Sequence, residues 1–156
     1  MLRRFMLLLV AAFAPVAFSQ EIKQPNVHLI YMGGNDCPFC VAWVATELPI
    51  LEKSDEFTRI QFSKVVKAIK SPVPPRFFLP SEVKPFKEKL DYASSGRSGS
   101  PQFALMVDGE VYDYFHGTRT AKQIEDMLVS VRNGTTYPFK RCIKASDAWK
   151  KCEIAG

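Results

Sequence analysis

Residues 35–43 have the sequence NDCPFCVAW, and the two cysteines in it, Cys37 and Cys40, decide how the rest of the chain is interpreted. A buried strand is predicted just before this stretch, at 27–32, because VHLIYM is a nearly continuous apolar run. A helix is predicted from Pro38 onward, because apolar residues then recur at intervals of three and four. The cysteines are therefore expected at a turn from strand to helix.

This placement makes Cys37 the predicted N-cap and Pro38 the first helical residue, a position that suits proline because its missing amide would have had no helical partner. The free amides of the first turn, including that of Cys40, are expected to point at the sulfur of Cys37. Amides and the helix dipole favour the thiolate form, which is the nucleophile. Cys37 is thus the expected exposed nucleophile, and Cys40, one turn inside the helix, the resolving cysteine.

Three interpretations of this cysteine pair compete. An inert disulfide is a weak hypothesis, because a two-residue loop removes little chain entropy from the unfolded state. A structural zinc site needs four ligands, and none of the other candidates has close paired spacing: Cys142, Cys152, His28 and His116. Thiol-disulfide chemistry is favoured, and no metal site is predicted.

Further elements follow from the same periodicities. A strand is predicted at 57–66, with Ile60 and Phe62 on its inner face. After a proline-rich connection, a short helix is predicted at about 82–92, with Ser81 as its cap.

The last third of the chain carries the clearest signals. Asp108-Gly109 predicts a tight hairpin between strands at 102–107 and 110–115. Thr120 and Gln123 have the spacing of a capping box, which opens a helix that ends near Asn133-Gly134. With a right-handed crossover between the first two strands, the predicted fold is α/β, a central mixed four-stranded sheet flanked by helices.

The chain resembles the exported branch of the thioredoxin superfamily in three places. These are the CPFC motif at 37–40 after a buried strand, Ser100-Pro101 before the hairpin, and Gly117 after it. The resemblance covers about residues 24–132 and implies a thioredoxin-like fold. It also implies that both cysteines of the motif are catalytic.

The resemblance further implies a substrate-binding role for Ser100 and Pro101, together with Pro38 and Phe39 of the motif. In the family the proline at the position of Pro101 is cis and leaves the backbone before it free to pair with an extended peptide. From the sequence alone, an ordinary trans proline that opens an edge strand remains the alternative.

Two positions depart from the family pattern. Many thioredoxins have a buried carboxylate six residues before the first cysteine and a tryptophan directly before it, whereas this chain has Tyr31 and Asp36. Either change is expected to alter proton transfer to Cys40 or the fit of a partner. A negative charge at Asp36 is also expected to raise the pKa of the Cys37 thiol.

The start of the chain predicts export. Arg3 and Arg4 precede a short apolar core, and small residues then allow cleavage before Gln20. The predicted organisation is a signal peptide at 1–19, a thioredoxin-like domain at 20–134 and a C-terminal tail at 135–156. An uncleaved membrane anchor is the alternative. The expected location is the periplasm, without stable membrane insertion after cleavage.

Cys142 and Cys152 lie in the tail, where a disulfide between them would tie it down. A second redox pair that exchanges with the first is the alternative interpretation. The net charge of +5 comes from scattered lysines and arginines, so nucleic-acid binding is not expected.

The sequence therefore predicts an exported thiol:disulfide oxidoreductase that acts on protein disulfides through Cys37 and Cys40 and needs no cofactor. The expected partners are exported proteins with thiols or disulfides, and a membrane or periplasmic protein that recycles the pair. The direction of electron flow stays open. The alternative function is a non-catalytic binding module for a soft metal such as Cu(I), or for a polypeptide.

Overall fold

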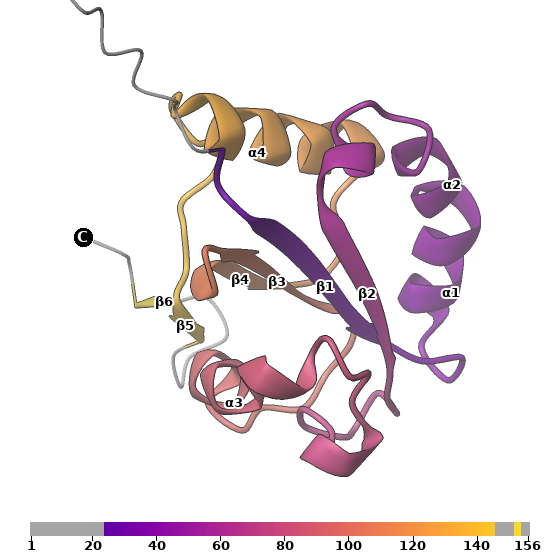
Figure 1. Cartoon of the computed structure of the whole chain (residues 1–156). Helices are drawn as coiled ribbons and strands as arrows, with labels where there is room; N and C mark the ends of the chain where they lie inside the picture. Colours follow the sequence, from indigo (N-terminus) through magenta and orange to yellow (C-terminus); the bar gives the residue numbers. More distant parts are fainter. Residues whose placement is uncertain (1–23, 146–151, 154–156) are drawn as a thin grey trace, which may run out of the picture.

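The computed structural model describes residues 24–145 and the backbone of residues 152–153 (Figure 1). The predicted signal peptide at 1–19 and its cleavage site before Gln20 lie outside these residues. Within them, no helix is long and apolar enough to cross a membrane.

A mixed sheet of four strands forms the centre of the domain, in the order β2-β1-β3-β4. β1 (Val27–Gly33) is parallel to β2 (Gln61–Val66) and antiparallel to β3 (Gln102–Val107). β4 (Glu110–His116) is antiparallel to β3 and forms the other edge. Every residue of β1 is buried, which confirms the prediction of a buried strand before the cysteines.

Three helices cover one face of the sheet: α1 (Pro38–Thr46), α2 (Leu48–Leu51) and α4 (Ala121–Asn133). Their buried side chains form one core cluster with residues of the sheet such as Leu29 and Phe103. Helix α1, which has the two cysteines at its start, belongs to this layer and follows the central strand β1 in the chain.

The opposite face is covered by α3 (Lys87–Ser94) and by the 3-10 turns η2 (Arg76–Phe78) and η3 (Lys84–Phe86) that precede it. A second core cluster fills this side, with Leu90 of α3 packed near Met32 of β1. The domain therefore has three layers, helix, sheet and helix. The predicted α/β class and the mixed four-stranded sheet are both confirmed.

The turn and cap signals in the last third of the chain are confirmed. Asp108 and Gly109 both have positive φ, 50° and 83°, as a tight hairpin requires. Thr120 and Gln123 form the full capping box at the start of α4, and Gly134 ends the helix in the left-handed conformation.

Two predicted elements differ from the structure. The second strand begins only at Gln61, because residues 57–59 form the 3-10 turn η1 (Phe57–Arg59). Its fully buried side chains are Ser63 and Val65, whereas the predicted inner residues Ile60 and Phe62 are partly buried on the other side.

The prediction for the third helix was also inaccurate. It begins at Lys87, and its N-cap is Phe86, which makes no side-chain capping bond. Ser81 donates instead to the carboxylate of Glu82. The proline-rich connection and η3 occupy the residues in which the sequence pattern placed the first turns of this helix.

The prediction that the apolar residues recurring at intervals of three and four in the first helix face the core is partly wrong. Val41 is 49% exposed, while Trp43, at 1%, is the side chain that α1 buries against the sheet. The helix breaks at Glu47, and α2 begins at Leu48 with Pro49 in its first turn. Proline is tolerated there because a first-turn amide has no helical partner.

The segment after α4 is held against β4 by one buried carboxylate. Asp113 is completely buried and accepts bonds from the guanidinium of Arg119 at 3.0 Å, the hydroxyl of Tyr137 at 2.9 Å and the amide of Cys142 at 2.9 Å. The amide of Tyr114 also donates to the carbonyl of Cys142 at 2.6 Å. Hydrogen bonds of Tyr137 and Cys142 therefore hold the start of the tail on the edge strand.

We predict that Asp113→Ala destabilises the domain by about 3–5 kcal/mol, because it leaves the guanidinium of Arg119 buried without its counter-charge. Urea unfolding of the purified protein measures this loss. Asp126→Ala is the matched control, because Asp126 pairs with Lys122 on the surface of α4 and such pairs contribute about 1 kcal/mol or less. Equal losses in the two variants would contradict the assignment of Asp113 as the anchor.

Candidate functional site

Cys37 and Cys40 form a disulfide at the start of α1, with their Cα atoms 5.1 Å apart. Cys37 is the N-cap, in an extended conformation, and Pro38 is the first helical residue. The amide of Cys40 donates to the sulfur of Cys37 at 3.2 Å. The predicted capping arrangement is therefore present, and the amide at the helix start favours negative charge on Cys37.

Both sulfurs of the pair are covered. Cys37 is 0% exposed and Cys40 is 1% exposed, whereas Phe39 between them is 70% exposed. The expectation that Cys37 would be exposed is therefore wrong. The structure brings the loop before Pro101 over this cysteine, a long-range contact that no local sequence pattern reports.

Ser100 and Pro101 lie beside the cysteines, as the resemblance implied. The carbonyl oxygen of Ser100 is 3.4 Å from the sulfur of Cys37. The Ser100-Pro101 peptide bond is cis, and the amide of Gly117 donates to the carbonyl of Pro101 at 3.0 Å. The loop before β3 therefore contacts the sulfur of Cys37, and Gly117, directly after β4, holds that loop in place.

A buried lysine, which the sequence analysis missed, joins the loops around the site. Lys67 is 4% exposed, and its ammonium donates to the carbonyls of Ser71 and Gly99, both at 2.7 Å. Burial lowers the pKa of Lys67 to about 8. The signal that could have found it is the strand alternation, since it continues the buried series of Ser63 and Val65.

Asp36 makes a different contact from the one expected. Its carboxylate accepts the amide of Ile69 at 2.9 Å, so it links the turn before α1 to the segment after β2. This bond fixes the turn that carries Cys37. The expected effect of Asp36 on the pKa of the Cys37 thiol stays a prediction.

Tyr31, which replaces the buried carboxylate of many thioredoxins, lies next to Cys40. Its ring stacks on Trp43 with the ring centres 5.0 Å apart, and burial raises its pKa to about 12. A Cβ atom on Gly33 would clash with the Tyr31 hydroxyl and lie 2.8 Å from the Cys40 sulfur. Gly33 therefore leaves room for the phenol beside the sulfur.

A cavity of about 410 Å³ adjoins this side of the cysteine pair, between α1 and the edge strand β2. Tyr31 and Cys40 line its inner part, and Lys64 and Val66 lie on β2 at its border. Cys40 therefore has a lined space beside it, on the side of the helix away from Ser100.

The two histidines differ in their surroundings. Ser63 donates to Glu82, so it accepts from the Nε2 of His28 at 2.9 Å. This buried bond gives His28 a structural role, linking β1 to β2. His116, at the end of β4, has its pKa lowered to about 4, first by burial and then by the positive charges of Lys67 and Arg97.

Cys142 is a free cysteine in the structure, and it lies where the tail contacts β4. The tail continues into a short hairpin of β5 (Lys144–Ala145) and β6 (Cys152–Glu153), in which Cys152 pairs with Ala145. The side chain of Cys152 lies outside the described residues, so a disulfide between Cys142 and Cys152 stays a prediction.

Among the described residues, no group of three or more histidine, cysteine or acidic side chains is close enough to hold a metal ion. The chemistry that the site can perform with its own atoms is thiol-disulfide exchange. The two sulfurs can store and release two electrons by breaking and forming their bond.

The strand order, the cysteine pair at the start of α1 and the X-Pro bond beside it define a thioredoxin-like domain. No protein-family model and no curated protein sequence matches the chain.

The solved structures that are similar to the chain include two bacterial proteins. The reduced form of the periplasmic thioredoxin SoxS from Paracoccus pantotrophus is 16% identical, with a TM-score of 0.44, over 69% of this chain and 97% of that one. The N-terminal domain of PilB from Neisseria gonorrhoeae is 17% identical, also with a TM-score of 0.44, over 73% of this chain and 80% of that one. The assignment of the fold rests on the topology of the chain itself.

We predict that His116 makes the stability of the domain depend on pH between about 4 and 6.5. In this range the unfolded chain binds a proton at His116 and the folded chain does not, so stability falls as the pH drops from 6.5 toward 4. His116→Asn should remove this contribution and flatten the curve. Unfolding of both proteins in urea across this range measures it, and parallel curves would contradict the prediction.

We also predict that the double variant Cys142→Ser, Cys152→Ser unfolds at a lower temperature, because a disulfide across this loop contributes about 3 kcal/mol at most. Thermal unfolding with and without reductant measures the effect. Reductant should lower the melting temperature of the parent through this bond and leave the double variant less affected. Loss of disulfide exchange at unchanged stability would instead show that these cysteines are a second redox pair.

Proposed function

We propose that the protein is an exported thiol:disulfide oxidoreductase that acts on protein disulfides through Cys37 and Cys40. One observation carries the proposal: the sulfur of Cys37 caps α1 and receives the amide of Cys40 at 3.2 Å. A sulfur in this position is stabilised as a thiolate, which is also a good leaving group. An inert disulfide has no need of such a donor.

In the reducing direction, the Cys37 thiolate attacks one sulfur of a partner disulfide and releases the other as a thiolate. Cys40 then loses its proton and attacks the Cys37 sulfur, which frees the second partner thiol. The partner gains two electrons, and Cys37 and Cys40 are left as the disulfide present in the structure. The reverse order of steps would donate the disulfide to a dithiol partner.

The second step differs from that of thioredoxins with a buried carboxylate, because Tyr31 stands in its place. With a pKa of about 12, its phenol stays protonated at neutral pH and cannot take the proton of Cys40 as a carboxylate could. The proton of Cys40 therefore needs another acceptor. The adjoining cavity, which Cys40 and Lys64 both line, is where such an acceptor would lie.

A partner polypeptide would approach at the surface formed by Pro38, Phe39 and Ser100, with Pro101 buried beside Ser100. Phe39 is the exposed apolar contact, and the backbone at Ser100 supplies polar groups for an extended chain. Because Cys37 is covered and the carbonyl of Ser100 lies against its sulfur, the partner must displace the segment before Pro101 to reach that sulfur. Binding of the partner would then be the event that exposes the Cys37 sulfur.

Export is the second part of the proposal, and the basic and apolar start of the chain supports it. In a bacterium this route leads to the periplasm, where protein thiols and disulfides are exchanged. The partners would be exported proteins with thiols or disulfides. A membrane or periplasmic redox protein would recycle the pair.

The burial of Cys37 favours one alternative, a thioredoxin-like module that binds a soft metal such as Cu(I) or a polypeptide without turnover. Such a module would retain its ligand through purification and would not catalyse exchange. The cysteine variants below separate the two functions.

We predict that Cys37→Ser abolishes reduction of a model protein disulfide, since Cys37 is the sulfur that the amide at the helix start favours as a thiolate. Cys40→Ser should accumulate a mixed disulfide with the partner, because the resolving thiol is missing. Product thiols and covalent adducts measured by mass spectrometry report both outcomes. The control is Cys142→Ser, which should keep turnover near that of the parent, and full turnover by Cys37→Ser would refute the proposal.

A further inference from the structure

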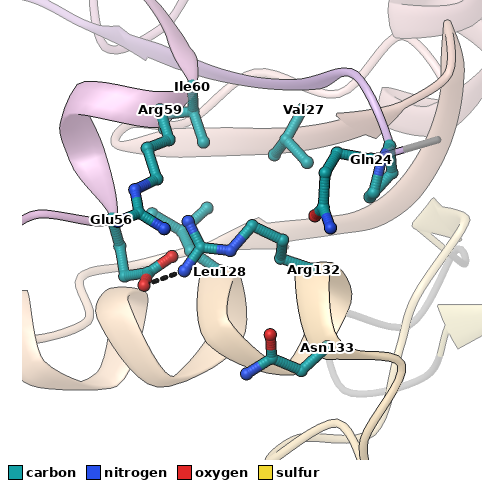
Figure 2. A pocket seen from close by; sticks show the side chains of 9 residues that line it. Gln24, Val27, Glu56, Arg59, Ile60, Leu128, Arg132 and Asn133 are labelled. Carbon is teal, nitrogen blue, oxygen red and sulfur yellow. Dashed lines mark hydrogen bonds and ion pairs between the residues drawn. The ribbon is translucent and has the colours of Figure 1, made fainter. Parts of the chain in front are cut away.

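A second cavity, of about 400 Å³, lies at the end of the sheet where β1 begins, whereas Cys37 follows the other end of that strand (Figure 2). It is bordered by the segment at residues 24–25, by the region of η1 and by the last turns of α4. The redox chemistry described above does not involve it. Its lining combines two arginines with an apolar wall.

The polar part of this cavity carries an excess of positive charge. The guanidinium groups of Arg59 and Arg132 point toward each other, with the carboxylate of Glu56 beside them (Figure 2). Glu56 forms an ion pair with Nη2 of Arg132. The lining of the cavity therefore has two cations and one anion, which leaves one positive charge without a counter-charge.

Two observations show that one nitrogen of the Arg132 guanidinium lacks a hydrogen-bond acceptor, and that Arg59 lacks a counter-charge, among the described residues. Nη1 of Arg132 is buried and has no hydrogen-bond partner among the residues that the structure describes. Arg59 makes no ion pair within the same residues, although its side chain turns toward the cavity. Arg59 is exposed, so an anion in the cavity could accept hydrogen bonds from it and would offset the excess positive charge of the lining.

Apart from the polar side chains of Gln24 and Asn133, the rest of the lining is apolar. Val27 and Leu128 are buried, Ile60 is partly buried, and Pro25 closes the same side. Leu128 and Arg132 lie one turn apart on α4, so the apolar wall and the positive charge are presented together. A bare inorganic anion would leave this wall unused.

We propose that this cavity binds a carboxylate attached to a small apolar group. The carboxylate would lie between Arg59 and Arg132 and accept from both, since a guanidinium matches its two oxygens. The apolar group would pack on Leu128 and Val27. The volume is at the lower end of the range for small-molecule sites, which fits a ligand of this size.

The same chemistry is available from two sources, a free organic acid or the C-terminus of a polypeptide that ends in an apolar residue. Either would present one carboxylate and one apolar group to the cavity. The site is independent of the proposed redox function, because it lies at the opposite end of β1 and shares no residue with the cysteine pair.

Hexanoate is the test ligand, and hexanol, which lacks the charge, is its control. With the full chain labelled at its methyl groups, we expect hexanoate to give saturable NMR shifts at Val27, Ile60 and Leu128. Hexanol at the same concentration should give no saturable shifts. A short peptide ending in leucine with a free carboxylate, compared with its C-terminal amide, then separates the two sources.

Arg59→Gln is the test variant, because Arg59 is exposed and its removal leaves the ion pair of Glu56 and Arg132 in place. It should weaken hexanoate binding roughly tenfold or more, the loss of a hydrogen-bonded charge. Arg76→Gln makes the same change of charge outside this cavity and should bind as the parent does. Equal shifts from hexanol, unchanged binding by Arg59→Gln, or no shift with hexanoate in the parent would each overturn the proposal.

Discussion

The bond between the amide of Cys40 and the sulfur of Cys37 is the interaction on which the site depends, because it exists only where a helix begins directly after a buried strand. Gly33 keeps Tyr31 and Cys40 close, and Asp36 fixes the turn through the amide of Ile69. Each of these contacts sets the position of one sulfur. The amide of Cys40 favours negative charge at Cys37, and the contacts of Gly33 and Asp36 position the two cysteines.

The same helix is tied to the far edge of the sheet through a series of polar contacts. The indole nitrogen of Trp43 donates to the carbonyl of Arg119 at 2.8 Å, and the guanidinium of Arg119 pairs with Asp113. The aromatic rings of Phe115 and Phe139 lie on either side of that guanidinium, 3.6 and 4.0 Å from its centre. Helix α1, the edge strand β4 and the start of the tail are therefore held as one unit.

Local patterns predicted the parts of the structure that local forces determine. The hairpin at Asp108-Gly109, the capping box at Thr120 and the N-cap at Cys37 each depend on a few neighbouring residues, and all three are present. The spacing of residues did not reveal the contacts that cross the chain. Lys67 bonds to a carbonyl 32 residues away, and the strand alternation indicates only that its side chain is buried. The loop at Ser100 contacts a cysteine 63 residues before it, a position that the family resemblance implied and that no local pattern predicts.

The reduction potential of the Cys37-Cys40 couple tests whether the pair is a working redox couple. The protein carrying Cys142→Ser and Cys152→Ser is equilibrated with glutathione and dithiothreitol buffers, and its free thiols are trapped and counted by mass spectrometry. A working couple should have a potential between about −120 and −270 mV, the range of known thiol-disulfide oxidoreductases. A value below about −300 mV, typical of disulfides that stay closed, would contradict the account and make the pair a structural bond.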